Sequence, residues 1–144
     1  MEDENDSIRR LRAREDVRRL LFDYARFIDA GDIDLFAELF AAQAEWIGPR
    51  SHLVGREEIR RHFGGRVSGQ SSFHLVANSQ IDLEDDCSTG RVWSLFAYIT
   101  QGLGNDGPRL DTFGHYEDVV GVEGGAWRFL RRQVFHDIPA RHES

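Results

Sequence analysis

The first part of the chain carries apolar residues at helical spacing. Over residues 7–30 they recur at steps of three and four, and arginine and acidic residues fill the other side. This pattern is typical of a long amphipathic helix, which could break near Arg14. Similar spacing predicts a short second helix over residues 33–40 and a third over residues 55–63. We expect the acidic residues 1–6 to form a disordered tail.

The pattern then changes to strand spacing. Apolar and polar residues alternate over residues 73–83, 91–101, 110–122 and 126–138, and links rich in Gly, Asp, Asn and Ser join them. These segments predict four long strands, and a short strand at residues 44–47 precedes the third helix. Helices followed by a meander of strands predict an α+β domain, with the helices on one face of a curved antiparallel sheet.

Composition narrows the classes of protein to consider. The 144 residues suit a single domain, and 40% hydrophobic with 11% aromatic residues suits a thick core or an apolar cavity. A net charge of −7 argues against a nucleic-acid partner. Cys87 is the only cysteine and the histidines show no metal-ligand spacing, so we predict no metal and no cofactor. With no signal peptide or membrane-spanning run, we expect a cytoplasmic protein without a membrane partner.

Candidate chemistry centres on the strand at residues 73–83. Alternation places His74, Val76 and Asn78 on one face. A histidine accepts a proton near neutral pH, because its ordinary pKa is about 6.5. A carboxylate bound to one ring nitrogen would fix the tautomer and stabilise the imidazolium. Asp29, at the end of the first helix, is the carboxylate best placed for this role. If the two residues do not meet, His74 is instead a core histidine and Asp29 a helix cap.

Several stretches of the chain, from about residue 14 to residue 136, carry a family resemblance. They are Tyr24-Ala-Arg-Phe-Ile-Asp-Ala-Gly-Asp32, Leu39-Phe-Ala-Ala-Gln-Ala-Glu-Trp46, His74-Leu-Val-Ala-Asn78, Gly114-His-Tyr-Glu-Asp118 and Ala126-Trp-Arg-Phe. Together they resemble the SnoaL-like branch of the nuclear-transport-factor-2-like superfamily. The resemblance implies one domain over residues 1–144: a cone-shaped, cystatin-like α+β barrel in which the curved sheet wraps around three N-terminal helices and an apolar pocket.

Within that branch the chain looks most like the scytalone dehydratase, hexachlorocyclohexane dehydrochlorinase and bile-acid dehydratase group. Their chemistry uses an Asp near the end of helix one and a His on a strand, and Asp29 and His74 fall at those positions. Asn78 matches the dehydrochlorinase. Ketosteroid isomerases instead place an Asp after the first strand, and the matching stretch Trp46-Ile-Gly-Pro-Arg50 has no carboxylate. A ketosteroid-isomerase mechanism is therefore disfavoured.

Further residues are expected to bind the substrate. Tyr24, one and a half helical turns before Asp29, is the first candidate to assist a leaving group, and Trp46 should point into the cone. The resemblance suggests that Ser94 and Phe96 line the pocket. It also places Arg132 where the dehydrochlorinase has an arginine that receives the leaving group, which makes Arg132 a candidate anion binder.

The first predicted function is a cofactor-free lyase of dehydratase or dehydrohalogenase type, or an isomerase. Its substrate would be a small hydrophobic cyclic compound, and His74, oriented by Asp29, would be the general base. Non-catalytic binding, a role like the small subunit of dioxygenases, and a polyketide cyclase or hydroxylase remain open alternatives. Large apolar residues on the outer sheet face predict a homo-oligomer, with a trimer slightly favoured over a dimer. The Asp29–His74 distance separates the enzyme reading from the others.

Overall fold

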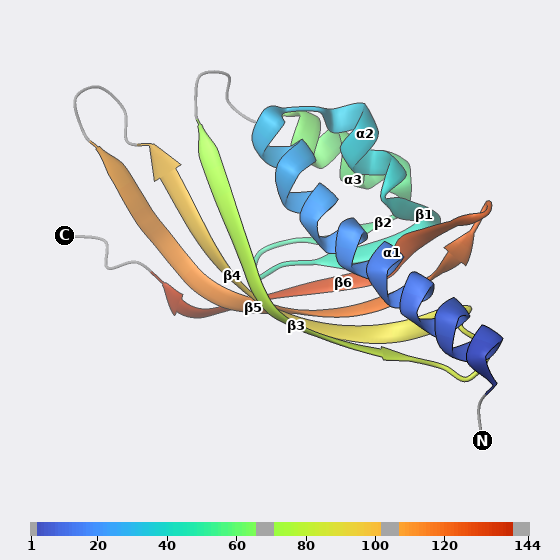
Figure 1. Cartoon of the computed structure of the whole chain (residues 1–144). Coiled ribbons are helices and arrows are strands. Elements are labelled where there is room, and N and C mark those ends of the chain that lie inside the picture. Colours follow the sequence, from blue (N-terminus) through green and yellow to red (C-terminus); the bar gives the residue numbers. More distant parts are fainter. Residues whose placement is uncertain (1–2, 66–70, 102–106, 140–144) are drawn as a thin grey trace.

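The helices precede the long strands and lie together over one face of the sheet (Figure 1). The computed structural model describes residues 3–65, 71–101 and 107–139. Its elements, in chain order, are α1 (Glu4–Ala30), α2 (Ile33–Glu38), β1 (Phe40–Ile47), β2 (His52–Val54), α3 (Arg56–Gly64), β3 (Ser72–Leu83), β4 (Thr89–Gln101), β5 (Pro108–Glu123) and β6 (Ala126–Pro139). The predicted α+β class is confirmed.

Helix α1 starts earlier than predicted and runs without a break at Arg14. The Asp3 side chain caps it by accepting a hydrogen bond from the backbone N–H of Asp6 at 2.8 Å. Acidic residues in the first turn also suit the positive end of the helix dipole. The expected disordered tail is therefore wrong from Asp3 onward. The helix ends as predicted at Gly31, whose φ of 76° is the left-handed conformation that glycine adopts without strain.

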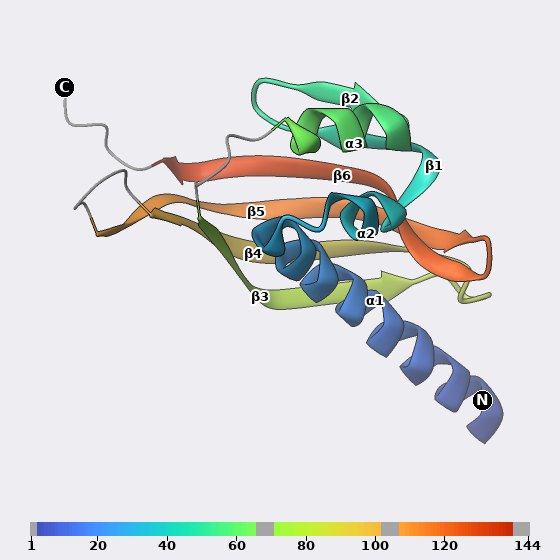
Figure 2. The same ribbon diagram turned by 90° about the horizontal axis from the view of Figure 1, so that it is seen from above.

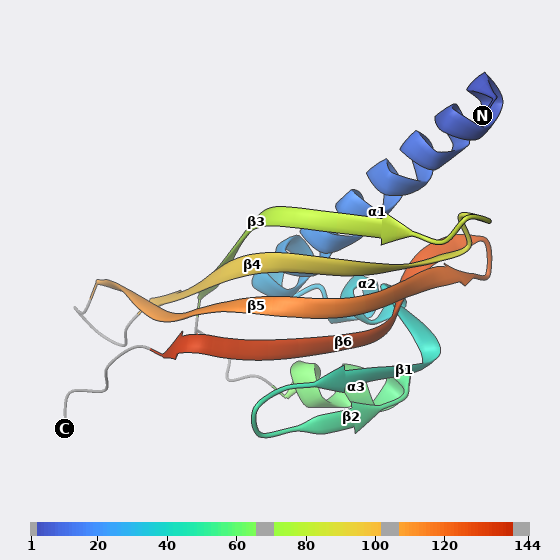
Figure 3. The same ribbon diagram turned by 90° about the horizontal axis from the view of Figure 1, so that it is seen from below.

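The strands form one curved, open sheet in the order β2-β1-β6-β5-β4-β3. All neighbours are antiparallel except β1 and β6, which run parallel. Strand β2 was not predicted, and the predicted second helix extends too far, because Phe40 already begins β1. Seen from above, α1 lies across β3 (Figure 2), and seen from below, none of the helices in the described ranges covers the outer face of the sheet (Figure 3).

The core fills the space between the helices and the inner, concave face of the sheet. Val17 and Leu21, four residues apart on α1, are fully buried there, as are Phe36, Phe40 and Phe129. Burying each such side chain stabilises the fold by roughly 1.5–3 kcal/mol. This core closes one end of the space under the helices and leaves the other end open as a pocket.

Strand β3 contains a bulge at Asn78. Its φ is 53°, and the pairing with β4 shifts between Ala77 and Gln80. A bulge places one extra residue on its strand, so the alternation of faces reverses beyond it. His74 and Ile81 therefore both face inward, although they are seven positions apart and simple alternation would place them on opposite faces.

Candidate functional site

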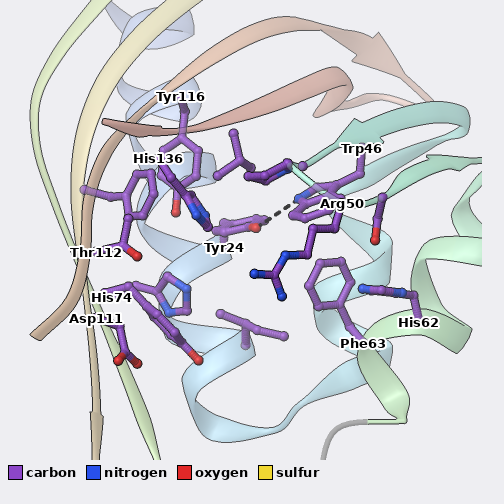
Figure 4. Close-up of a pocket in the computed structure, with 17 residues that line it drawn as sticks. Tyr24, Trp46, Arg50, His62, Phe63, His74, Asp111, Thr112, Tyr116 and His136 are labelled. Atoms are coloured by element: carbon purple, nitrogen blue, oxygen red, sulfur yellow. Dashed lines mark hydrogen bonds between the residues drawn. The ribbon is translucent and has the colours of Figure 1, made fainter. Parts of the chain in front are cut away.

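A cavity of about 600 Å³ opens between the end of α1, helix α3, the β1–β2 turn and the concave face of β4, β5 and β6 (Figure 4). Its walls are largely aromatic and apolar, and several polar side chains converge on it. Those walls include Tyr24, Ile28, Trp46, Phe63, Phe96, Tyr98, Tyr116 and Val134, with Arg50, His62, His74, Asp111, Thr112 and His136 as polar members. An apolar pocket with a few placed polar groups is typical of a site for a small molecule.

Asp29 and His74 touch at the wall of this pocket. Asp29 Oδ1 lies 2.6 Å from Nδ1 of His74, and Oδ2 accepts the backbone N–H of His74 at 2.7 Å. The Ser72 hydroxyl donates a third hydrogen bond to Oδ1 at 3.0 Å. The two side chains are only 17% and 12% exposed, so little water competes for these bonds. The end of α1 and the start of β3 therefore hold the pair in a fixed geometry.

That geometry assigns different tasks to the two nitrogens of His74. A carboxylate at Nδ1 is an acceptor, so it favours the tautomer that carries its proton there. Nε2 then keeps its lone pair, and no described residue forms a hydrogen bond to it. The ring packs 4.7 Å from Tyr98 and edge-on to Tyr24 at 6.3 Å, which limits its rotation. A proton acceptor thus stands on the pocket wall.

The opposite wall is built on the turn between β1 and β2. The backbone N–H of Gly48 donates to the carbonyl of Ser51 at 2.8 Å and closes the turn. A Cβ at Gly48 would lie 2.5 Å from the indole of Trp46, so glycine is needed for the turn to close over that ring. The indole N–H of Trp46 donates to the Tyr24 hydroxyl at 3.1 Å, which ties this wall to α1 (Figure 4).

Five of the predicted site residues meet at this pocket. His74, Tyr24, Trp46 and Phe96 line it, and Asp29 supports His74 from behind. Phe96 stacks on Tyr116 with ring centroids 4.4 Å apart, so the pocket floor is a rigid pair of aromatic rings.

Two of the predicted substrate-binding residues, Asn78 and Ser94, lie away from the pocket. The bulge turns Asn78 away from the face of His74, and its side chain is exposed. Ser94 is on the inner face but fully buried in the core, and its hydroxyl has no hydrogen-bond partner among the described residues. Neither lines the pocket.

Arg132 also needs correcting, because it is sealed in the core and does not reach the pocket. Its guanidinium is 0% exposed and binds Asp118 through two hydrogen bonds of 2.9 and 3.2 Å. The rings of Tyr116, Tyr24 and Phe129 surround it at 3.6–4.5 Å. Burial raises the pKa of Asp118 to about 6, although the charge of Arg132 acts against this rise. With its charge matched inside the core, Arg132 is a structural residue and not an anion binder.

Sequence reasoning missed Arg50, His62, Asp111 and Tyr116 as pocket residues. Strand spacing places His136 on one face of β6 with Val134 and Arg132, but it left open whether that face meets the pocket, and His136 lines it. Tyr116 lies opposite Ser94 in the pairing of β4 with β5. Its position could be predicted only with the register of these two strands. Arg50 lies in a turn, where no periodicity predicts the direction of a side chain.

The described residues contain no group of three His, Cys, Asp or Glu side chains that could hold a metal ion. The prediction that neither metal nor cofactor is used stays a prediction. None of the helices in the described ranges has the length and apolar character needed to cross a membrane.

A curved open sheet wrapped around N-terminal helices, with a pocket beneath them, defines the class of protein. It is the nuclear-transport-factor-2-like fold, also described as cystatin-like, and solved structures of both descriptions match this chain. More narrowly, the chain belongs to the SnoaL-like domain family, whose model matches residues 9–133. No curated protein sequence matches it.

Solved structures support the fold at low sequence identity. A protein of unknown function from Mycobacterium tuberculosis is 18% identical with a TM-score of 0.79, covering 93% of this chain and 75% of its own. Two proteins of Novosphingobium aromaticivorans also match. One, named as a candidate scytalone dehydratase, is 21% identical with a TM-score of 0.78 and covers 99% and 93%. The other, named as a candidate aromatic ring hydroxylase, is 20% identical with a TM-score of 0.76 and covers 90% and 92%.

Proposed function

We propose that this protein is a cofactor-free lyase or isomerase that removes a proton from a small hydrophobic cyclic compound. The observation that carries the proposal is the 2.6 Å contact between Asp29 and His74 at the wall of an aromatic pocket. A fixed carboxylate, a histidine with one free nitrogen and an apolar cavity are the parts that general-base catalysis on such a compound requires.

In this mechanism Nε2 of His74 takes a proton from carbon, and the charge that develops on the ring is balanced by Asp29. For a dehydratase, the electron pair of the broken C–H bond forms the alkene and hydroxide leaves. The imidazolium returns its proton to the hydroxide, and water is released. For an isomerase, the same proton returns to a different carbon. General-base catalysis contributes roughly 10²–10⁴ in rate.

The test is a panel of hydroxylated and halogenated cyclic compounds, followed by product analysis with the wild type and His74→Ala. We expect turnover of at least one compound, and a loss of roughly 10²–10⁴ in the variant. His115→Ala is the matched control, because His115 also binds an aspartate but lies on the outer face. Turnover that His74→Ala leaves unchanged would remove His74 from the mechanism. Binding without turnover of any compound would favour a pocket protein that is not an enzyme.

The assembly and location of the protein stay part of the proposal. A homo-oligomer, with a trimer slightly favoured over a dimer, would cover apolar side chains that the outer sheet face exposes, among them Phe73, Leu75, Phe113 and Ile138. We also propose that the protein acts in the cytoplasm on a small molecule, without a nucleic-acid or membrane partner.

A further inference from the structure

The solvent-facing side of α1 carries two exposed apolar side chains with a pair of charges between them. Leu11 and Phe22 are 66% and 48% exposed, and Leu11 is the most exposed large apolar side chain of the described residues. Glu15 and Arg18 lie between them, so the four residues follow one another at steps of four, three and four. Such steps place all four side chains on one helix face, as in the a and d positions of a coiled coil. We call this face the α1 stripe.

The first turns of α1 extend past the sheet and bury none of their own side chains (Figure 2 and Figure 3). Residues 4–12 are all at least partly exposed, and Ala13 is the first residue of the helix that lies in the core. A helix end that packs against nothing is marginal in water, because most helical stability in proteins comes from packing. The cap at Asp3 determines where the helix starts but does not cover Leu11. A partner along the α1 stripe would supply that packing.

The order of the charges on the stripe fits a second copy of the same helix. Arg18 Nη1 donates to a carboxylate oxygen of Glu15 at 2.7 Å on its own helix. In an antiparallel pair with a twofold axis between residues 16 and 17, Glu15 of each helix faces Arg18 of the other. The same alignment places Leu11 of each helix against Phe22 of the other. A parallel pair would instead bring like charges together, so the charge order selects the antiparallel pair, and symmetry makes every contact twice.

We propose that two copies of this protein associate through their α1 stripes, packed antiparallel. The contact is separate from the outer sheet face and does not depend on the proposed function. Four charges of alternating sign form its centre, and Leu11 against Phe22 forms each of its two ends. The projecting turns of one α1 then lie against the part of the other α1 that its core holds in place. Stable complexes bury roughly 1,200–2,000 Å², and so short a helix pair is small beside them, so the association is reversible and depends on concentration.

Exchanging the charges tests the pairing directly. Glu15→Arg makes both central residues of the stripe basic, and Arg18→Glu makes both acidic. Each variant should weaken self-association roughly tenfold, because two attractive pairs become two repulsive pairs. An equimolar mixture of the two variants should associate as the wild type does, since opposite charges face each other again. The double variant, Glu15→Arg with Arg18→Glu, should also recover self-association. Sedimentation velocity over a range of protein concentrations measures all of these.

The apolar ends of the contact are tested with a matched control. Leu11→Gln with Phe22→Gln keeps good helix formers at both positions and should reduce self-association at least as strongly as either charge variant. Leu35→Gln removes a similar side chain, 51% exposed on α2, and should leave self-association unchanged.

A second background keeps the outer sheet face out of the measurement. Phe113→Glu with Ile138→Glu places charges on that face, and self-association through α1 should persist in this background. Three results would each overturn the proposal. They are a monomer at every concentration in that background, self-association that Leu11→Gln with Phe22→Gln leaves unchanged, and two charge variants that fail to associate with each other when mixed. Loss of the ion pair within one helix cannot imitate the expected result, because mixing would not repair it.

Discussion

His74 and His115 each place Nδ1 2.6 Å from an aspartate oxygen, of Asp29 and Asp137 respectively. His74 lies on the inner face of the sheet, where its ring forms part of the pocket wall. His115 lies on the outer face and stacks on Phe135 at 4.5 Å. One contact distance thus occurs in two different environments.

The second ring nitrogen decides what each pair can do. Nε2 of His115 lies 3.2 Å from Glu117, so carboxylates face both of its nitrogens. Burial lowers the pKa of His115, but the hydrogen bonds to Asp137 and Glu117 outweigh that effect and raise it above the ordinary 6.5. Both nitrogens of His115 are engaged by carboxylates, so neither is left to accept a proton from a ligand. A His–Asp contact alone is no evidence for catalysis; a free nitrogen in a pocket must accompany it.

The sharpest test of this difference removes the carboxylate charge from each pair. Asp29→Asn should lower turnover roughly 10²-fold, because an amide cannot balance the imidazolium that forms on His74. Asp137→Asn should leave turnover within about twofold, since no step involves His115. The measurement is kcat on the best substrate of the panel. Equal losses in the two variants would mean that both act through the fold and not through the base.

A third carboxylate–cation pair, Arg132 with Asp118, is completely buried, and this changes how much its loss should cost in stability. Arg132→Met would leave the fully buried Asp118 without a partner, and we expect a loss of roughly 3–5 kcal/mol in the free energy of unfolding. The double variant Arg132→Met with Asp118→Leu should recover most of that loss, because no unpaired charge remains. Urea unfolding measures both. A double variant as unstable as the single one would show that the pair itself stabilises the core.

The smallest expected effect concerns the pH dependence of stability from His115. Because its folded-state pKa is raised, its contribution is fully present below about pH 6.5 and is lost as the pH rises through the higher folded-state pKa. The acids that face it are about half exposed, so the amplitude should be below about 1 kcal/mol. Urea unfolding of the wild type and His115→Gln at several pH values measures it; a stability difference that does not change with pH would contradict this linkage.

Much of the fold was predictable because spacing alone determines it. Helical spacing in the first part of the chain and alternation in the second specify the helices, the long strands and their order. The failures have a common physical origin in local geometry. Residue spacing did not predict that β1 starts at Phe40, that the short strand β2 forms, or that Asp3 caps the first helix.

The candidate site was predictable only in part. The resemblance pointed to Asp29 and His74, and the structure brings them into contact. It also pointed to Arg132, but the pairing of that residue with Asp118 depends on the register of β5 and β6, which the sequence does not specify. Arg50 was missed because its direction depends on how the turn closes over Trp46.

The bulge at Asn78 has a consequence for how distant relatives are aligned. Deleting that single residue would restore plain alternation, and one half of β3 would then have to exchange its inward and outward side chains. Either His74 would leave Asp29, or Ile81 would leave the core. A relative that lacks this one residue would therefore differ in the side chains that line its pocket or fill its core, whereas loss of one residue in a surface turn would change neither.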